Sequence, residues 1–332
     1  MPPIMYGGIE RIVSGLAGGL RALGHKVGLV ATPGSSCVVD QFYGWRGKTP
    51  LGKRDTLVNT ALLLRAFFNF RPDVVHSFSR AALLTPILRS RKAKIISLQL
   101  PPQVRNVGRV QRLGRNVRFT GCSEHICRAG QRGGGRWTAI HNFVELDKFT
   151  FTPTVASDAP LVFLSRIEEQ KGAHLAIEIA KRTGRPLIIA GNHSPTADAA
   201  VFWRQRIEPE IGRNGISYIG PVNDQQKDAL LGRASAMVVP VQWDEPFGIV
   251  FAESLACGTP VLSCPRGAVP EIVRNGLEGF LASAVEDLCH AVGQIPKIRR
   301  QACRERAENC FSVAVIARKY EHLYESMLIA SR

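Results

Sequence analysis

The chain has 332 residues, of which 45% are hydrophobic, and its 43 Lys and Arg against 27 Asp and Glu give a formal net charge of +16. This length suits two domains of about 150 residues each, and the composition is that of a globular protein rather than a disordered or fibrous one. No apolar run approaches the ~18–20 residues that span a bilayer, and MPPIMYGG lacks the segments of a signal peptide, so we expect a cytoplasmic protein.

The first half alternates β-branched runs with helical stretches, the pattern of a parallel α/β sheet. In chain order we predict helix 8–23, strand 26–31, helix 55–70, strand 73–77, helix 80–90, strand 94–98, strand 118–121, helix 123–131 and strand 137–141. A doubly wound unit normally opens with a strand ahead of its first helix, yet this sequence begins at PPIMYGGIERIV, in the loop before that helix. We expect the opening strand, which would lie at the centre of the sheet, to be missing.

The second half repeats the pattern. We predict strand 161–164, helix 173–183, strand 186–190, strand 216–219, helix 223–233, strand 236–241, helix 248–257 and strand 260–263. The Pro- and Thr-rich segment 150–160 is the expected linker. A final helical stripe is formed by Val313, Ile316, Tyr320, Leu323, Tyr324 and Met327. We therefore expect domains 1–150 and 151–310, each doubly wound, with a C-terminal helix over 311–332 and a ligand cleft at the carboxyl ends of the strands.

The positive charge is concentrated in the first half. Residues 1–150 carry 23 Lys and Arg against 7 Asp and Glu, whereas residues 151–332 carry 20 of each. No acid occurs from Val74 to Ser123, where the basic residues are Arg80, Arg89, Arg91, Lys92, Lys94, Arg105, Arg109, Arg112, Arg115 and Arg118. This is either a solvated basic surface or a face that meets an anionic partner, such as a membrane surface, a lipid phosphate or a nucleic acid.

The eight cysteines are scattered, with no C-x-x-C and no Cys/His cluster at zinc spacing. We expect free, mostly buried thiols and no metal site.

Gly7 and Gly8 stand directly ahead of the first amphipathic helix, in GGIERIV. Without side chains, their backbone can approach a ligand closely, and a helix N-terminus favours an anion, although a plain tight turn also explains them. Neither G-x-G-x-x-G nor G-x-x-x-x-G-K-[ST] occurs, which argues against dinucleotide dehydrogenases and P-loop proteins.

Two cations follow the first strand of the second half, in SRIEEQKG. Arg166 and Lys171 are placed to hold a diphosphate at the carboxyl end of that strand, unless they are solvated loop residues. There is no D-x-D pair to carry Mg²⁺, so fixed cations and helix dipoles would have to compensate a bound diphosphate.

Two acids flank the predicted start of helix 248–257, in EPFGIVFAE. The backbone amides near residues 247–250 form an anion site at that helix start. A carboxylate aimed at the same phosphate would be repelled, so Glu245 and Glu253 more plausibly accept hydrogen bonds from hydroxyls on either side of it. A structural cap plus a surface acid would explain either glutamate alone, but explains the pair poorly.

With these motifs in place, the sequence resembles the retaining GT-B glycosyltransferases of family 4. The resemblance rests on E-x7-E as EPFGIVFAE, followed by ACGTPVLSCPRGAVPEIVRNGLEGFL, and on GGIERIVSGLAGGLRALGHKV, DVVHSF, AIHNFVELDKF, SRIEEQKG and LIIAGN. They occur in family order from residue 7 to about residue 282. The fold implied is α/β, GT-B, with two Rossmann-like domains facing a central cleft.

The resemblance implies a role for each matching residue. Catalytic roles fall to Glu245, Arg166, Lys171 and His76. Donor-binding roles fall to Phe247, Gly248, Ile249, Val250, Glu253, Gly7 and Gly8. The first domain would bind the acceptor, the second the nucleotide sugar, and the C-terminal helix would pack back on the first domain.

Three positions depart from the family pattern. Ser165 replaces the usual Gly before the arginine, and Asn142-Phe143 replaces Asn-Gly. Phe78 stands where the family often has a second His, and Arg80, two positions further on, could compensate. A His that ends a buried strand, as His76 does, is more often structural than catalytic.

The implied reaction is retaining transfer of a hexosyl group from a UDP-, GDP- or ADP-linked sugar to an acceptor hydroxyl, without metal or other cofactor. Because the acceptor domain carries the net charge, we expect an anionic or lipid-linked acceptor in cell-envelope glycan, lipopolysaccharide or glycolipid synthesis, and an enzyme peripheral to the inner face of the membrane. The alternatives are a nucleotide-sugar 2-epimerase on the same scaffold, an inactive truncated glycosyltransferase, and a nucleic-acid binder. The last lacks support, since aromatics are only 7% and no recognition motif accompanies the basic stretch.

Overall fold

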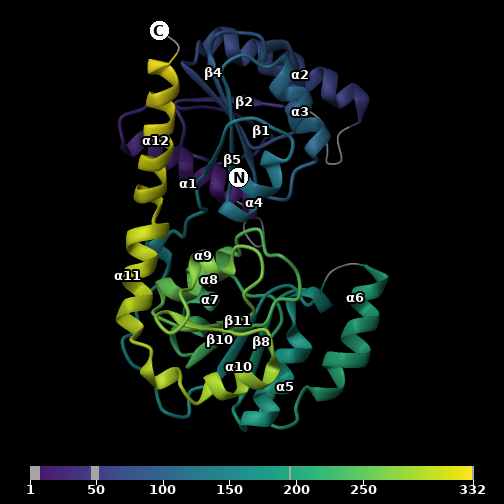
Figure 1. Ribbon diagram of the computed structural model, residues 1–332, viewed down its shortest axis with the longest axis vertical. Coiled ribbons are helices and arrows are strands. Elements are labelled where there is room, and N and C mark those ends of the chain that lie inside the picture. Colours follow the sequence, from purple (N-terminus) through teal and green to yellow (C-terminus); the bar gives the residue numbers. More distant parts are fainter. Residues whose placement is uncertain (1–7, 46–51, 194–195, 331–332) are drawn as a thin grey trace. The chain divides into compact units, whose positions relative to one another are not determined.

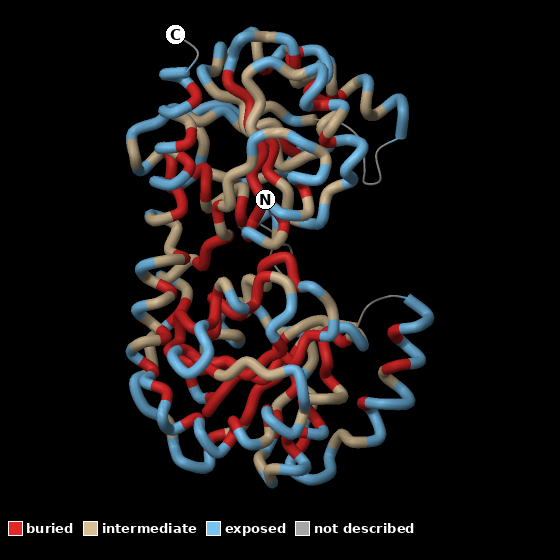
Figure 2. The backbone as a smooth tube through the Cα atoms, viewed as in Figure 1, coloured by how far each residue is buried: buried red, intermediate tan, exposed pale blue. Residues whose placement is uncertain are grey.

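The computed structural model describes residues 8–45, 52–193 and 196–330, and the chain divides into two compact units (Figure 1). Unit 1 comprises residues 1–142 and 313–332, and unit 2 comprises residues 143–312. Each unit has its own buried strands, with exposed residues on the outer helices (Figure 2).

Unit 2 is built on one continuous parallel sheet in the order β12-β11-β10-β7-β8-β9. Its strands are β7 (Leu161–Leu164), β8 (Leu187–Ala190), β9 (Ile216–Tyr218), β10 (Ala236–Val239), β11 (Val261–Ser263) and β12 (Gly279–Leu281). Its helices are α5 (Ala173–Thr183), α6 (Ala197–Phe202), α7 (Asp224–Gly232), α8 (Ile249–Ala256), α9 (Val269–Ile272), α10 (Val285–Val292) and α11 (Arg300–Phe311). The first strand, β7, lies at the centre between β10 and β8, and all its residues are buried. This burial is why the strand reads as an unbroken apolar run, LVFL, instead of alternating.

Unit 1 contains two separate parallel sheets, β1-β2 and β3-β4-β5-β6. Its strands are β1 (Gly28–Ala31), β2 (Gln41–Gly44), β3 (Val74–Ser77), β4 (Ala93–Leu98), β5 (Val117–Gly121) and β6 (Trp137–Ala139). Its helices are α1 (Gly8–Ala22), α2 (Lys53–Phe70), the 3-10 helix η1 (Ala81–Ile87), α3 (Val104–Leu113), α4 (Glu124–Gln131) and α12 (Val313–Ile329).

The strands at the division between these sheets are poorly covered. All four residues of β3 are only half-buried, whereas the first five residues of its neighbour β4 are buried. In unit 2 the strand before the first helix, β7, lies at the centre of the sheet; in unit 1 α1 is the first described element. The predicted missing strand concerns the segment ahead of α1, and residues 1–7 lie outside the described part.

Helices cover both faces of the four-stranded sheet. Ile96 of β4 packs in a cluster with residues of α2, η1 and α3. Its neighbour Ser97 points to the opposite face, where it meets Tyr320 of α12. Helix α12 also packs against α1, with Gly19 directly against Val313 and Ala317. The predicted stripe is confirmed, since Ile316, Tyr320, Leu323 and Met327 are buried.

Most predicted elements are confirmed to within a few residues, and strand 161–164 has the predicted ends. The predicted helix over 80–90 is confirmed in part: the segment forms the shorter 3-10 helix η1, which contains Pro86, a residue without a backbone N–H. The elements that were not predicted include β2, α3, α6, β12, α10 and α11.

The expected linker, 150–160, is bonded into unit 2. The backbone N–H of Thr150 donates to Asp228, and that of Thr152 donates to the carbonyl of Cys257. Arg300 donates to the carbonyl of Thr152. The division between the units instead falls at residues 142 and 143, and the return at 312 and 313.

Candidate functional site

The predicted site of unit 2 lies where two neighbouring strands end. Strands β7 and β10 pair in parallel, with Leu161 opposite Ala236 and Val162 opposite Met237. Their carboxyl ends therefore meet at one edge of the sheet, the edge where open α/β proteins bind ligands. The loop after β7 carries Arg166 and Lys171, and the loop after β10 carries Glu245 and leads into α8.

Lys171 and Glu245 form a buried ion pair across these two loops. The Lys171 Nζ lies 2.6 Å from the Glu245 Oε2, and each residue is less than a tenth exposed. Trp243 donates a second hydrogen bond to the same oxygen, with 2.9 Å between its Nε1 and the Glu245 Oε2. The Nζ also lies 4.6 Å from the centroid of the Trp243 ring, within the range of a cation–π interaction.

Close backbone packing holds the pair together. Gly172, which follows Lys171, has φ +79°, and a Cβ there would overlap the carbonyl oxygen of Pro240 at the end of β10. Gly267 has φ +61°, and a Cβ there would overlap the backbone of Glu245. Since both positions combine a left-handed conformation with no room for a side chain, glycine is required at each.

Glu253 is also paired with a lysine. It lies in the second turn of α8, and its Oε1 is 2.6 Å from the Lys227 Nζ of α7. The two side chains are 10% and 14% exposed, so the pair is largely shielded from water. Lys227 also lies 3.6 Å from Asp224. Both acids of the E-x7-E motif thus have a lysine partner on a different element.

Arg166 has one guanidinium nitrogen engaged and another without a partner. Its NH1 nitrogen lies 2.8 Å from the Glu168 Oε1. Its buried Nε has no hydrogen-bond partner within the part of the chain that the structure describes. An unpaired buried donor is costly, so this nitrogen is suited to an acceptor supplied by a ligand.

Helix α8 begins directly after Glu245. Gly248 is its N-cap, and the N–H of Phe251 already bonds to the carbonyl of Gly248. Phe247 is buried, and Ile249 and Val250 form the first turn. First-turn amides have no acceptor one turn back within their own helix, and they carry the positive end of its dipole. Glu245 thus pairs with Lys171 and is followed two residues later by the 247–250 segment.

The predicted site residues of unit 1 are Gly7, Gly8 and His76. Gly8 is the first residue of α1, and Gly7 lies outside the described residues. His76, in β3, has both ring nitrogens engaged: Nδ1 lies 2.7 Å from the Tyr324 hydroxyl of α12, and Nε2 lies 2.5 Å from the Ser97 Oγ of β4. Ser97 is in turn 2.5 Å from the Thr120 Oγ1.

This network is largely shielded from water, with Ser97, Thr120 and Tyr320 buried and His76 and Tyr324 half-buried. Burial lowers the pKa of His76 from 6.5 to about 3, and burial raises the pKa of both Tyr320 and Tyr324. The ring of Phe78 packs 4.4 Å from that of His76, measured between centroids. A neutral imidazole with two hydrogen-bond partners ties α12 to β3 and β4. Its catalytic role stays a prediction, and would need one of these partners to leave.

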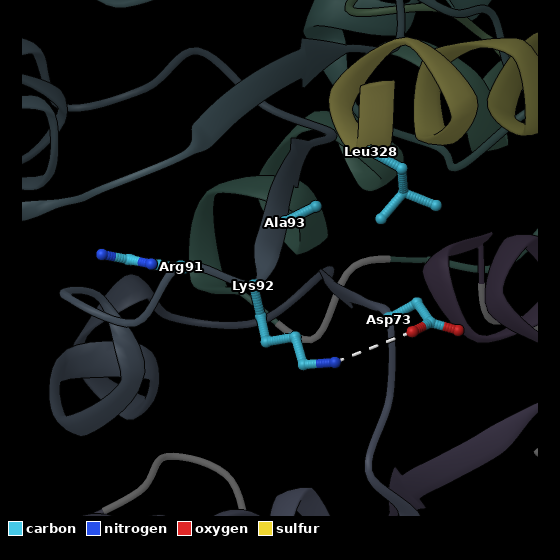
Figure 3. A pocket seen from close by; sticks show the side chains of 5 residues that line it. All are labelled: Asp73, Arg91, Lys92, Ala93 and Leu328. Carbon is cyan, nitrogen blue, oxygen red and sulfur yellow. Dashed lines mark ion pairs between the residues drawn. The ribbon is translucent and has the colours of Figure 1, made fainter. Parts of the chain in front are cut away.

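A shallow pocket in unit 1 is lined by Asp73, Arg91, Lys92, Ala93 and Leu328 (Figure 3). Asp73 and Lys92 face each other across it, with 3.6 Å between the Lys92 Nζ and the Asp73 Oδ1. Both residues directly precede strands, β3 and β4, so the pocket lies at the amino edge of the sheet. Ligands of open α/β sheets bind at the opposite edge, and we do not assign this pocket to the site.

Sequence reasoning missed Lys227 and Trp243. Trp243 stood two positions before Glu245 in QWDEP, and its indole N–H could have been considered as a donor to that acid. Nothing in the sequence pairs Lys227 with Glu253, 26 residues away, before the fold brings α7 beside α8. Five of the eight cysteines are buried, in agreement with the expectation of mostly buried thiols.

Each unit has parallel strands covered by helices, and unit 2 has loop cations and the start of α8 at the carboxyl edge of its sheet. This is the architecture of a GT-B protein. Two family models match nearly the whole sequence: Glycosyltransferase Family 4 over residues 6–148 and Glycosyl transferases group 1 over residues 150–309. The chain belongs to glycosyltransferase family 4.

Solved structures share the fold across the chain. A glycosyltransferase involved in avilamycin A biosynthesis matches 99% of this chain and 92% of its own, with a TM-score of 0.73 and 24% identity. The Anabaena protein HepE, in complex with UDP and glucose, matches 98% of this chain and 97% of its own, with a TM-score of 0.74 and 18% identity.

A curated relative shares more sequence over a shorter stretch. The D-inositol 3-phosphate glycosyltransferase of Mycobacterium tuberculosis is 31% identical over 169 residues, which are 48% of this chain and 34% of that protein. The match therefore spans about a third of the relative's length. None of the described helices is long and apolar enough to cross a bilayer.

Proposed function

We propose that the protein is a retaining glycosyltransferase that moves a hexosyl group from a nucleotide diphosphate sugar to an acceptor hydroxyl. The observation that carries this proposal is the junction of Lys171, Glu245 and the start of α8 at the carboxyl edge of unit 2. A cation and a helix start suit a diphosphate, and the acids beside them suit hydroxyls. The likeness to HepE, whose structure contains UDP and glucose, supports the same class of donor.

Before a donor binds, the charged side chains of the proposed site are already paired with one another. Lys171 is paired with Glu245, Lys227 with Glu253 and Arg166 with Glu168, so three cations face three carboxylates. The net charge of the site therefore attracts a diphosphate only weakly. The unpaired Arg166 Nε and the first-turn amides of α8 supply the donors that a diphosphate can take without breaking a pair.

Lys171 binds the diphosphate by exchanging its partner: a phosphate oxygen takes the place of the Glu245 carboxylate. In the resting site Glu245 occupies the position of an anion on Lys171, at 2.6 Å. When a phosphate oxygen replaces it, Trp243 still donates to the Glu245 Oε2, so the buried carboxylate keeps a partner. Glu245 is then released to accept a hydrogen bond from the transferred sugar, while Glu253 accepts from the ribose.

The chemical step follows from where charge develops. As the glycosidic bond breaks, negative charge builds on the departing diphosphate, and the cations and helix start are fixed there in advance. The leaving phosphate helps to take the acceptor proton, so no protein nucleophile is needed and the anomeric configuration is kept. Because these groups all belong to the protein and none is a metal ion, we expect EDTA to leave the transfer rate unchanged.

We propose an anionic or lipid-linked acceptor, as in cell-envelope glycan, lipopolysaccharide or glycolipid synthesis. The support is the charge of unit 1, since residues 1–150 hold the whole net charge of the chain. A basic surface raises the local concentration of anionic partners and speeds their association. Such an acceptor would be met at a membrane surface, with the protein peripheral to it.

The test is a panel of UDP-, GDP- and ADP-sugars incubated with lipid-linked and phosphorylated acceptors, with nucleotide release as the readout. We expect release to require both an acceptor and one class of donor, and to be lost in Lys171→Ala and Glu253→Ala. The exposed Lys181→Ala, whose partner is Glu210, is the matched control. Conversion of a donor sugar without acceptor would instead identify an epimerase, and no turnover of any donor would reject the proposal.

A further inference from the structure

One helical layer of unit 1 presents a distinctive outer surface. Helices α2, η1 and α3 cover the same face of the four-stranded sheet, where Leu64, Leu84 and Val107 belong to one core cluster. Their opposite sides are exposed. The exposed arginines on this layer are Arg54 and Arg65 of α2, Arg89 after η1, and Arg105, Arg109 and Arg112 of α3. We call these six residues and the surface around them the basic helical face.

These arginines are spaced so that they point the same way. On α3, Arg105, Arg109 and Arg112 follow each other at intervals of four and three, while Val107 and Val110 of the opposite stripe are buried. On α2, Arg54 and Arg65 lie in a stripe whose members are all exposed: Arg54, Leu57, Ala61, Arg65 and Phe68. Each helix therefore presents cations outward.

The arginines of this face are unpaired. None of the six makes an ion pair with any carboxylate that the structure describes, and no acid occurs between Val74 and Ser123. Some exposed cations of unit 2 are paired instead: Lys181 pairs with Glu210, and Arg182 with Glu286. The charge of the basic helical face is thus available to a partner.

Large apolar side chains are exposed among the arginines. Leu57 is 73% exposed and Phe68 67%, and on α3 Val104 is 41% and Leu113 53% exposed. Exposing such side chains to water is unfavourable, and their combination with cations is the composition of surfaces that lie in the membrane interface. Nucleic-acid surfaces use aromatic or polar groups to stack on or read bases, and aliphatic Leu57, Val104 and Leu113 do neither.

We propose that the basic helical face docks unit 1 onto the surface of an anionic lipid bilayer. The guanidinium groups would bind lipid phosphates, and Leu57 and Phe68 would enter the boundary between head groups and acyl chains. This extends the proposed function by naming the surface that brings the protein to a lipid-borne acceptor. Its test needs no transfer activity, so its failure is distinguishable from failure of the proposed reaction.

The experiment is co-sedimentation of the full chain with vesicles of phosphatidylcholine, alone or with phosphatidylglycerol. We expect binding to the anionic vesicles at least tenfold tighter than to the neutral ones, and falling steeply as salt is raised. Arg65→Glu with Arg109→Glu should weaken binding at least tenfold. Leu57→Ser with Phe68→Ser should weaken it severalfold and leave the remainder more sensitive to salt.

The matched control is Arg213→Glu with Arg233→Glu, which makes the same charge change at exposed positions of unit 2. It should bind vesicles like the wild type. Equal binding to both vesicle types, or an equal loss in the control, would overturn the proposal. So would an oligonucleotide binding more tightly than the anionic vesicles and displacing the protein from them. Thermal unfolding of each variant separates lost binding from lost folding.

Discussion

Both units are built on parallel strands covered by helices. They differ in how their charged side chains are paired. Unit 2 has a continuous sheet with its first strand at the centre, and its site lysines are locked in buried pairs with Glu245 and Glu253. Unit 1 has a divided sheet, and the six arginines of the basic helical face make no ion pair with any carboxylate that the structure describes. Net charge therefore does not locate the proposed donor site, which is balanced; it lies in unit 1, whose basic helical face we propose to bind an anionic bilayer.

The largest expected effect is on the rate, in Lys171→Ala. Removing this cation from the departing diphosphate should slow transfer on the order of 10²–10³-fold, the size of effect found when one preorganised donor is lost. Single-turnover rates with saturating donor would measure it. Lys181→Ala should stay within twofold of wild type, and a similar loss in both variants would remove the special role of Lys171.

The next effect is on stability, in Lys227→Met. This change leaves Glu253 charged in a shielded position, and breaking such a pair costs roughly 3 kcal/mol. Urea unfolding should show the loss, while Lys227→Met combined with Glu253→Gln should recover much of it. If the single variant is as stable as wild type, Lys227 does not hold Glu253.

Glu245→Gln is expected to have a smaller effect. It should tighten binding of the nucleoside diphosphate but slow turnover. The carboxylate competes with phosphate for Lys171, so its neutral replacement should tighten binding of the nucleoside diphosphate by about tenfold, or about 1.4 kcal/mol. Turnover should fall, because the neutral amide oxygen is a weaker hydrogen-bond acceptor for the sugar hydroxyl than the carboxylate. Calorimetric titration measures the first and nucleotide release the second. Glu210→Gln, in an exposed pair away from the site, should change neither. Weaker diphosphate binding in Glu245→Gln would contradict the exchange.

The effect that is smallest at neutral pH concerns His76 of unit 1, and it grows as the pH falls. Burial lowers the pKa of His76 from 6.5 to about 3, so below about pH 6.5 the unfolded chain takes up a proton that the folded ring refuses. The free energy of unfolding should therefore fall as the pH drops from about 6.5 towards 3, and His76→Gln should make that fall shallower. The exposed His322→Gln should keep the wild-type profile. Identical profiles for all three proteins would mean that His76 is not held neutral.

The sequence predicted what depends on local pattern. The apolar run LVFL gave strand β7, and the E-x7-E spacing placed Glu245 before α8 and Glu253 within it. Helix α3 was not predicted, although Val107 and Val110 form a buried stripe opposite its arginines, because only these two of its ten residues mark the buried side. The lysine partners could not be predicted, since each pairing joins residues from separate loops or helices. The network around His76 likewise depends on α12 returning across β4.

The central claim, that unit 2 grips a diphosphate through Lys171, is tested most directly by calorimetric titration of the wild-type protein with UDP, GDP and ADP and with the bare nucleosides. We predict saturable binding of at least one diphosphate, no binding of its nucleoside, and loss of the diphosphate heat in Lys171→Ala but not in Lys181→Ala. Binding that survives in Lys171→Ala, or that is as strong for the nucleoside as for its diphosphate, would contradict the account.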